Sequence, residues 1–297
     1  MVDVSRFTFP SIALLKHSPD DAFRMIAEAG FKNVDVLEKM PHLSIHADEC
    51  DPAAVKAAAD KHGLRITAVN SYVGGGVVGR AGAWLHHPGF VFPNKHKYTH
   101  NGFASDDPAV QEQELKHVCR AVDIGAFFGA RVVRIVPGDD DPAKIDHIVP
   151  WFRKCAAYAE KKGVFLAGEN HDTGILGQPK AFVELCEKVG SKHFGIIFEP
   201  YNLLEQAGLD FKKAFEIMRE HIVHVHFKDG RLDRNKRTYV PTLMGEGELD
   251  FRWLMKRLNE FGYTGELGLE YEVAEVPPEE GVKQFYKGFV KMMEGIS

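Results

Sequence analysis

The chain alternates, almost from end to end, between short apolar runs and longer segments with helical periodicity. Short runs bounded by turn residues predict strands, and apolar residues spaced three and four apart predict helices. The predicted strands are residues 5–9, 31–38, 64–70, 131–138, 163–171, 193–200, 222–229 and 265–272. The predicted helices are residues 18–30, 51–63, 109–130, 143–162, 178–190, 209–221, 249–262 and a last segment that begins near Pro278. Each predicted strand is therefore followed by a helix.

This order of elements favours one architecture. Parallel strands joined by helices form βαβ units, and eight units in 297 residues predict an α/β protein whose single domain, residues 1–297, is a (β/α)8 TIM barrel. The alternative is an open doubly wound sheet, which usually carries a glycine-rich phosphate-binding turn after its first strand. Residues 8–19 (TFPSIALLKHSP) contain no GxGxxG motif, so the barrel is the better prediction.

The alternation breaks after the third predicted strand. Residues 71–108 are rich in glycine and show no sustained period, so we interpret them as a long loop insertion. Loops of this length within a compact domain are usually functional or mobile. The segment contains four histidines, which could either cover a substrate as part of a lid or contact another subunit. They are His86, His87, His96 and His100.

Bulk properties disfavour several classes of protein. The net charge of −5 gives no reason to expect binding to nucleic acid, and no Lys/Arg run suggests a basic patch. The N-terminus has no apolar core of signal-peptide length, and no apolar window is long enough to span a membrane. The cysteines form no CxxC pair and are expected to be reduced thiols: Cys50, Cys119, Cys155 and Cys186. We therefore expect a cytoplasmic enzyme.

Candidate chemistry gathers at the ends of the last four predicted strands, where (β/α)8 barrels carry their active sites. Alternation in IVHVHFKD (222–229) gives two faces: Val223, Val225 and Phe227 toward the helices, and His224, His226 and Lys228 toward the barrel axis. Glu169, Glu199 and Glu270 end the other three strands and are predicted to point inward as well. Polar groups at the ends of four consecutive strands predict a shared site.

Carboxylates brought together in this way would repel one another. A pair about 4 Å apart costs on the order of 4 kcal/mol at an effective dielectric constant of 20. Either some of them are protonated, or a divalent cation lies between them. The carboxylates of Glu169, Glu199 and Glu270 with the imidazole of His226 suit a hard or borderline ion. We predict one divalent metal ion: Mn²⁺ by preference, or Mg²⁺, Co²⁺ or Zn²⁺.

The same strand ends carry a resemblance to a known family. The chain resembles the xylose isomerase-like TIM barrels, the sugar phosphate isomerases and epimerases, which include ketose 3-epimerases and inosose dehydratases and have endonuclease IV as a distant relative. The matching segments are LAGENH (166–171), GIIFEPYNLL (195–204), HVHFKD (224–229), GEGELDF (245–251) and LGLEYE (267–272). The resemblance covers the second half of the chain, and the first half agrees in its rhythm of strands and helices.

The resemblance implies roles for individual residues. Glu169 and Glu270 would bind the metal and act as catalytic groups on either side of the substrate. His226, the second histidine of HVH, would be a ligand, whereas His224 is interpreted as a packed residue behind it. Glu199 would be the fourth ligand, although it stands where the family normally has an aspartate. The extra methylene could shift the metal or lower its affinity.

Five residues are predicted to contact the substrate: His171, Asn202, Lys228, Asp229 and Glu246. Asn202 takes a position that is often a histidine in the family. Lys228 and Asp229 either contact a phosphate or hydroxyl group or form a surface ion pair. Glu246 either reaches the site or shapes the turn before the helix that Asp250 would cap.

The implied reaction is proton transfer beside the carbonyl group of a keto-sugar or sugar derivative. The metal would stabilise the enediolate, while one of Glu169 and Glu270 removes the proton and the other returns it, as in an isomerase or epimerase. The alternative is a dehydratase or lyase that expels a leaving group from the same enolate of a keto-sugar, an inosose or a 3-keto C-glycoside.

Two other classes are less favoured. A nuclease is disfavoured by the acidic chain and by Asn202 in place of a histidine ligand. A non-catalytic binding protein is favoured only by the unusual Glu199. The expected partner is a small sugar substrate, and a homo-oligomer is expected by resemblance.

Overall fold

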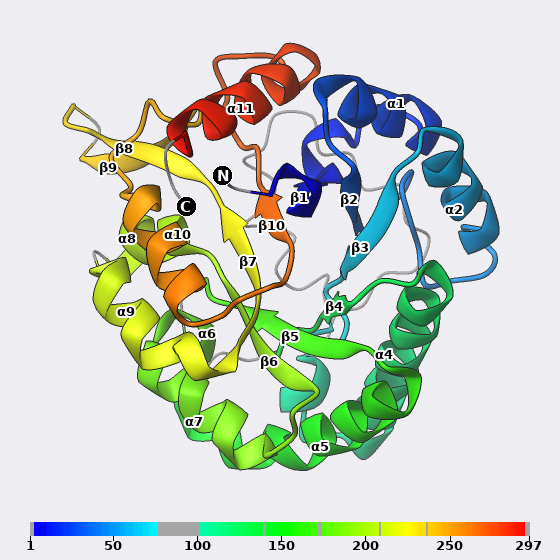
Figure 1. Ribbon diagram of the computed structural model, residues 1–297. Helices are drawn as coiled ribbons and strands as arrows, with labels where there is room; N and C mark the ends of the chain where they lie inside the picture. The colour runs from blue at the N-terminus through cyan, green and yellow to red at the C-terminus, as the bar shows by residue number, and fades with distance from the viewer. Residues whose placement is uncertain are drawn as a thin grey trace.

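The computed structural model describes residues 3–76, 101–138, 141–171, 174–207, 209–235 and 237–294. Within these residues, eight parallel strands close into a barrel in the order β1-β10-β7-β6-β5-β4-β3-β2. Helices surround the barrel on its outer side (Figure 1). The predicted (β/α)8 TIM-barrel fold is therefore confirmed, and the open-sheet alternative is wrong.

The barrel strands are shorter than the predicted segments. They are β1 (Phe7–Pro10), β2 (Asn33–Leu37), β3 (Arg65–Asn70), β4 (Val132–Arg134), β5 (Phe165–Glu169), β6 (Phe194–Phe198), β7 (Ile222–Phe227) and β10 (Leu267–Leu269). Glu199, Lys228 and Glu270 each follow directly after the last residue of a strand. The polar side chains of interest therefore lie where the chain leaves the sheet.

Eight of the described helices begin and end close to the predicted positions, and two short ones, at Gly174–Gly177 and Pro200–Ala207, were not predicted. The helices are α1 (Pro19–Ala29), α2 (Pro52–Lys61), α4 (Pro108–Phe128), α5 (Ile145–Lys162), α6 (Gly174–Gly177), α7 (Pro179–Val189), α8 (Pro200–Ala207), α9 (Phe211–Met218), α10 (Phe251–Glu260) and α11 (Pro278–Met292). Side chains cap many of them: Asp51, Asp107 and Asp250 each accept a hydrogen bond from a backbone N–H in the first turn. Local sequence signals of this kind explain why the boundaries could be predicted.

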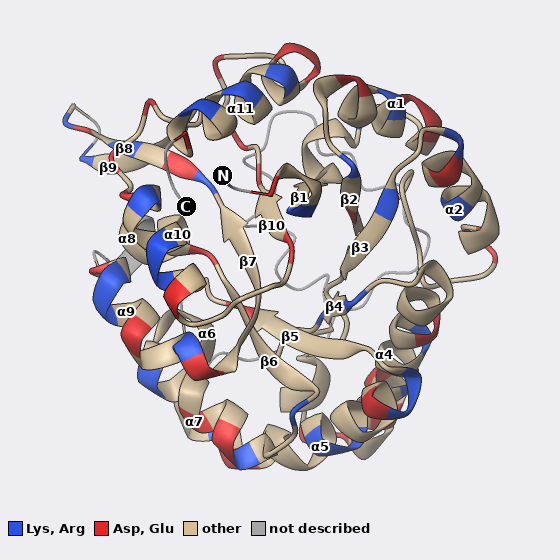
Figure 2. Cartoon of the chain, viewed as in Figure 1, with Lys and Arg blue, Asp and Glu red and all other residues tan. Residues whose placement is uncertain are grey.

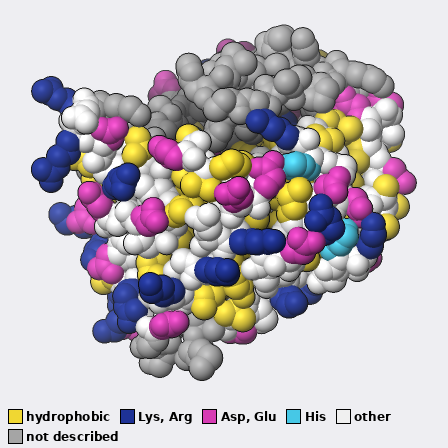
Figure 3. All heavy atoms as spheres, turned by 90° about the horizontal axis from the view of Figure 1, so that it is seen from above, with side chains coloured by type: hydrophobic (Ala, Val, Ile, Leu, Met, Phe, Trp, Pro, Cys, Tyr) yellow, Lys and Arg dark blue, Asp and Glu magenta, His cyan; other side chains and the backbone are white. Residues whose placement is uncertain are grey.

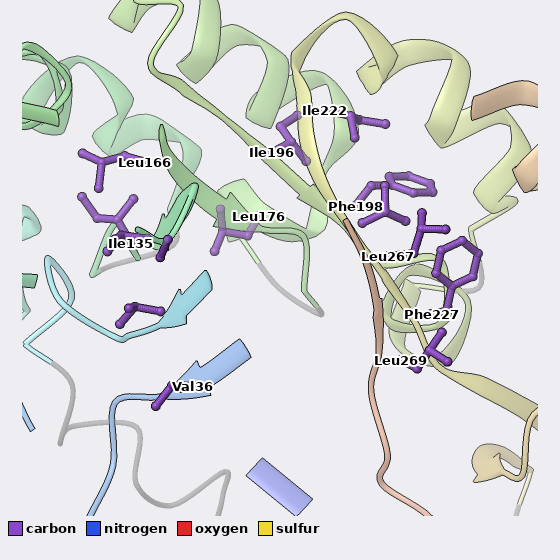
Figure 4. Close-up of a cluster of buried hydrophobic side chains, with 14 of the residues drawn as sticks. Val36, Ile135, Leu166, Leu176, Ile196, Phe198, Ile222, Phe227, Leu267 and Leu269 are labelled. Carbon is purple, nitrogen blue, oxygen red and sulfur yellow. The ribbon is translucent and has the colours of Figure 1, made fainter. Parts of the chain in front are cut away.

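The hydrophobic core has two layers. The larger layer lies between the strands and the helices, and Figure 4 shows part of it, with Leu166, Ile196, Phe198, Phe227 and Leu267 among its side chains. A smaller cluster fills the interior of the barrel and consists of Ala68, Val132, Ala167 and Ile197. These four side chains pack the interior of the barrel, and polar groups occupy the end at which the strands terminate.

One prediction about the direction of a side chain is wrong. Val223 packs against the inner cluster instead of facing the helices with Val225. The reason is a register shift: Ile196 pairs with Ile222 and Ile197 pairs with His224, so β7 carries an extra residue relative to β6. A bulge of this kind lets two successive residues face the same side. His224 and His226 still point into the barrel.

The seventh predicted strand does not run on to residue 229 as one element. It ends at Phe227, and Asp229 begins an antiparallel hairpin of β8 (Asp229–Asp233) and β9 (Thr238–Thr242). The hairpin extends beyond the ring of helices beside α8 and α10 (Figure 1). The sequence analysis missed it because it predicted no strand between residue 229 and the helix at 249–262.

The predicted insertion at 71–108 falls between β3 and α4. Its four histidines lie outside the described residues. Its remaining part includes a 3₁₀ helix at Gly102–Ala104.

On the described part of the face in Figure 3, charged side chains of both signs alternate with apolar ones. No helix among the described residues is long and apolar enough to cross a membrane.

Candidate active site at the strand ends

Buried charged groups converge at the C-terminal ends of the barrel strands. In Figure 2 most charged residues lie on the outer helices, while the strands are largely uncharged apart from positions near their ends. The exposed fractions of Glu169, Glu199 and Glu270 are 4%, 0% and 6%, and His226 is fully buried. Burial of this many ionisable groups is costly unless they are paired, so their contacts define the site.

Three of the four predicted ligands form one compact group. Glu169, His226 and Glu270 each offer a ligand atom within 4.8 Å of the other two, and all three side chains are buried. His226 Nδ1 lies 2.6 Å from Glu169 Oε1. Glycine at position 268 makes room for this group, because a Cβ atom there would lie 2.5 Å from His226 Cδ2. Two carboxylates and an imidazole are suitable ligands for a divalent ion.

Arg134, which sequence reasoning missed, is a direct partner of Glu169. It ends β4, and its Nη1 donates to Glu169 Oε2. Burial opposes the ionised form of Glu169, but His226 and Arg134 outweigh this effect and hold the pKa of the carboxyl below its usual range. The available signal was strand parity, since Arg134 lies two residues after Val132, which packs in the inner cluster.

Lys228 is a buried cation among carboxylates and not half of a surface ion pair. Its Nζ lies 3.0 Å from Glu270 Oε2 and 2.9 Å from Glu272 Oε2. It also donates to Asn202 Oδ1 at 3.3 Å. Burial works against the charged ammonium, but Glu270, Glu272 and Glu199 outweigh it and raise the pKa of Lys228 well above its usual value. A charged amine is therefore part of the site.

The structure places Glu199 apart from the other predicted ligands. One of its oxygens, Oε1, accepts a hydrogen bond from the Tyr201 N–H at 2.9 Å in the first turn of α8. The other, Oε2, lies 3.6 Å from Lys228 Nζ. Burial raises the pKa of Glu199 well above its usual value, and Lys228 only partly offsets this. Glu199 therefore lies outside the compact group of ligand atoms, and its buried Oε2 has no hydrogen-bond partner among the described residues.

Two asparagines connect the ends of β5 and β6. Asn170 donates from Nδ2 to the Glu199 carbonyl at 2.7 Å and accepts from the Glu199 N–H at 2.8 Å. Asn202 Nδ2 donates to the Asn170 carbonyl at 3.1 Å. His171 is half-buried, and its backbone N–H donates to the Leu176 carbonyl at 3.2 Å. Asn202 thus borders the buried group through Lys228, and a substrate contact by Asn202 or His171 stays a prediction.

Asp35 and His224 form a deeper pair behind His226. His224 Nε2 lies 3.0 Å from Asp35 Oδ2, and Thr8 and Thr67 donate their hydroxyl groups to Asp35 Oδ1. Burial opposes ionisation of Asp35, but His224 outweighs it and keeps the pKa below its ordinary value. Asp35, His224 and His226 are a second group whose ligand atoms lie within 4.8 Å of one another. His226 belongs to both groups.

The two remaining predicted substrate contacts lie at the base of the hairpin: Asp229 begins β8, and Glu246 lies in the loop after β9. Asp229 Oδ2 accepts from the N–H groups of Gly245 and Gly247 at 2.9 and 3.1 Å, and Oδ1 accepts from the Gly230 N–H at 2.9 Å. A side chain on Gly247 would place a Cβ 1.9 Å from Asp229 Oδ1. Glu246 is exposed in the same turn. The geometry favours a structural role for Asp229 and the turn-shaping alternative for Glu246.

We expect Asp229→Asn to lower the free energy of unfolding by about 2 kcal/mol, because backbone N–H groups lose a charged acceptor. Urea unfolding monitored by circular dichroism measures the change. Asp106→Asn is the control, since the Asp106 side chain is 87% exposed and should be nearly neutral. Weaker sugar binding by Asp229→Asn at unchanged stability would instead return Asp229 to the substrate site.

Glu38, just after β2, is a second buried carboxyl that sequence reasoning did not select. Burial raises its pKa to about 7 from an ordinary value of 4.5, and Lys39 only partly offsets the effect. The folded state therefore holds this proton more tightly than the unfolded state. Stability from this group is present below about pH 4.5 and is lost as the pH rises to about 7.

We expect Glu38→Gln to remove this part of the pH dependence. The loss for the native protein amounts to at most about 3.5 kcal/mol, at roughly 1.4 kcal/mol for each unit of pKa shift. Urea unfolding at pH 4.5, 5.5, 7 and 8 measures the difference between the two proteins. It should grow in favour of the variant up to pH 7 and then level off, and parallel profiles would contradict the assignment.

These features together define the class of protein. In (β/α)8 barrels the active site lies at the C-terminal ends of the strands, which is where this chain gathers its buried carboxylates, imidazoles and cations. Within that class, the chain belongs to the xylose isomerase-like TIM barrel family, which matches residues 23–288.

Individual relatives are more distant. A putative hydroxypyruvate isomerase from Mus musculus is 30% identical over 138 residues, which are 40% of this chain and 48% of that protein. The chain thus spans about half the length of the curated relative it matches. A structure of L-ribulose 3-epimerase has a TM-score of 0.73 at 15% identity and covers 98% of this chain and 95% of that one.

A xylose isomerase-like TIM barrel protein from Mycobacterium smegmatis, solved in complex with magnesium, has a TM-score of 0.71 at 16% identity. The alignment covers 99% of this chain and all of that one. Other structures with this fold include further epimerases and a probable dehydratase. At these identities the solved structures establish the fold alone.

Proposed function

We propose that this protein is a divalent-metal-dependent isomerase or epimerase of a keto-sugar or sugar derivative. The observation that carries the proposal is the buried group of Glu169, His226 and Glu270, whose ligand atoms lie within 4.8 Å of one another. β6 and β7 separate the strands of the two carboxylates, so these approach one position from different sides of the barrel. A reacting carbon near that position would be within reach of a carboxylate.

The donor set fits a divalent cation. The contact with Lys228 leaves Glu270 a second oxygen as a ligand, and the contact with Arg134 leaves Glu169 Oε1, which lies 2.6 Å from His226 Nδ1 and would share the cation with that imidazole. A cation held by these carboxylates and His226 would polarise the substrate carbonyl and make the adjacent C–H more acidic. Oxygen and imidazole ligands suit Mn²⁺, Mg²⁺, Co²⁺ or Zn²⁺, and Mn²⁺ is the ion we would test first.

The contacts of the two carboxylates favour different roles. Glu169 is bonded to Arg134 through one oxygen and faces His226 with the other, so it is suited to stay ionised as a ligand. Glu270 is the group that we expect to remove the proton. Isomerisation needs one carboxylate, which removes the proton from one carbon and returns it to the next, whereas epimerisation needs a second proton donor. This arrangement favours isomerisation.

A second candidate function is elimination by a dehydratase or lyase. It begins with the same removal of a proton by Glu270. The observation in its favour is Lys228, whose buried ammonium lies 3.0 Å from Glu270 Oε2. A charged amine next to the base could give a proton to a departing hydroxyl group.

The test is proton exchange in D₂O, followed by NMR, with the Mn²⁺-loaded protein and a panel of ketoses, inososes and hydroxylated keto acids. Deuterium next to a carbonyl together with an isomerised product supports an isomerase, and an inverted centre supports an epimerase. An unsaturated product supports elimination. No exchange with any compound would contradict the proposed function.

A further inference from the structure

Arg134 is a buried cation, and one nitrogen of its guanidinium group is not used by the contacts that hold the side chain. Its Nη1 donates to Glu169 Oε2 and its Nε donates to the Ser71 carbonyl at 3.1 Å. Its Nη2 is buried and has no hydrogen-bond partner at normal geometry among the described residues, although the Tyr72 side chain also interacts with the guanidinium. A buried donor in this state costs free energy, and at a functional site it commonly marks the place of a water or a ligand.

The guanidinium is fixed in place and has a second cation beside it. Its Cζ atom lies 4.1 Å from the centroid of the Tyr72 ring, and Lys39 Nζ lies 5.0 Å from the same centroid. Arg134 and Lys39 are 5% and 9% exposed. Two cations against one aromatic ring, one just after β2 and one at the end of β4, form a positive region across the barrel from Lys228 and Glu272.

We propose that Arg134 Nη2 binds a carboxylate that adjoins the substrate carbonyl, with Lys39 adding positive charge, so that the substrate is a hydroxylated 2-oxo acid. This inference rests on the proposed function, because it places the carboxylate in the same pocket as the proton transfer. It narrows the substrate from keto-sugars in general to those that carry an acid group beside the reacting carbons.

The position of Arg134 Nη2 close to Glu169 favours a carboxylate that is attached directly to the substrate carbonyl. Nη1 and Nη2 belong to one planar group, so an acceptor on Nη2 lies within a few ångströms of Glu169. A carboxylate attached directly to the carbonyl meets this condition. A phosphate at the far end of a sugar chain would be several carbons away. The flat carboxylate also matches the hydrogen-bonding edge of a guanidinium.

Three probes with three carbons each separate the possibilities. Hydroxypyruvate has a carboxylate next to its carbonyl, dihydroxyacetone has none, and dihydroxyacetone phosphate has a remote phosphate. Isothermal titration of the Mn²⁺-loaded protein should show hydroxypyruvate binding roughly 10- to 100-fold more tightly than dihydroxyacetone, the gain from a charge-assisted hydrogen bond. The phosphate should bring no comparable gain.

Two variants assign the effect to the guanidinium. Arg134→Lys keeps a cation near Glu169 but cannot offer two parallel N–H donors, and it should weaken hydroxypyruvate binding by roughly 10-fold or more beyond its effect on dihydroxyacetone. Arg131→Lys is the matched control. Arg131 precedes β4 at the other end of the barrel, stacks on Phe165 at 5.0 Å and donates to the Val223 carbonyl at 2.7 Å.

The outcomes separate this inference from the proposed function. Equal binding of hydroxypyruvate and dihydroxyacetone, or tighter binding of the phosphate, would overturn it. An equal loss for all probes in Arg134→Lys would also overturn it, because Arg134 would then act through Glu169. Proton exchange on neutral keto-sugars without hydroxypyruvate binding would leave the proposed function standing, whereas no exchange with any compound would remove both.

Discussion

Glu270→Gln is expected to slow proton exchange next to the substrate carbonyl by about 10²- to 10⁴-fold, the contribution typical of a positioned general base. Glutamine preserves the shape of the side chain but cannot accept the proton. Glu270 directly follows β10, and its Oε2 contacts Lys228 Nζ, so the group that is lost lies inside the buried site. NMR in D₂O on the best substrate of the panel measures the rate.

Glu266→Gln is the matched control for this variant. Glu266 directly precedes β10 at the opposite end of the barrel and is half-buried. The Glu266→Gln variant should therefore catalyse proton exchange within about twofold of the native rate. Metal content and the midpoint of thermal unfolding are measured for both variants. A folded, metal-loaded Glu270→Gln protein that exchanges protons at the native rate would remove Glu270 from the proposed mechanism.

Removal of the divalent ion is the second change with a large expected effect. Chelation should reduce proton exchange to background, and Mn²⁺ should restore it. Bound metal should also stabilise the fold by about 2.7 kcal/mol at a free concentration of 100 times the dissociation constant. Calorimetry with and without Mn²⁺ measures this shift independently of activity.

A variant of one ligand tests the location of the ion. His226→Gln should weaken Mn²⁺ binding by more than roughly 100-fold, because removing a direct ligand should exceed the 10- to 100-fold effect of outer-shell partners. His221→Gln, at the opposite end of β7, is the control and should bind Mn²⁺ like the native protein. Titration of Mn²⁺ measures both affinities. Unchanged affinity in His226→Gln would move the ion away from the predicted ligands.

Much of the fold could be predicted because its signals are local. The capping aspartates at residues 51, 107 and 250 and the short apolar runs place most elements within a few residues of their observed bounds. The inward direction of Glu169 followed from alternation along β5, where Ala167 belongs to the inner cluster. Alternation failed at Val223, because the extra residue in β7 exists only relative to its neighbour β6.

The candidate site was predictable in part. Sequence reasoning selected the strand ends that bring Glu169, His226 and Glu270 together. It missed Arg134 and took Lys228 only as a substrate contact or surface ion pair, because it considered compensation of the carboxylates by a metal but not by buried cations. These pairs depend on how far each side chain reaches across the barrel, which periodicity does not report.

By itself, the sequence determined the barrel and the end of it that carries the chemistry. Both follow from repeating patterns that act within single strands and helices. Only the tertiary structure decided which polar groups meet: Glu199 turns toward the Tyr201 N–H, Asp229 supports a loop, and His224 meets Asp35 from 189 residues away. The physical reason is that a buried charge takes the partner that closure of the barrel brings within a few ångströms, whatever their separation along the chain.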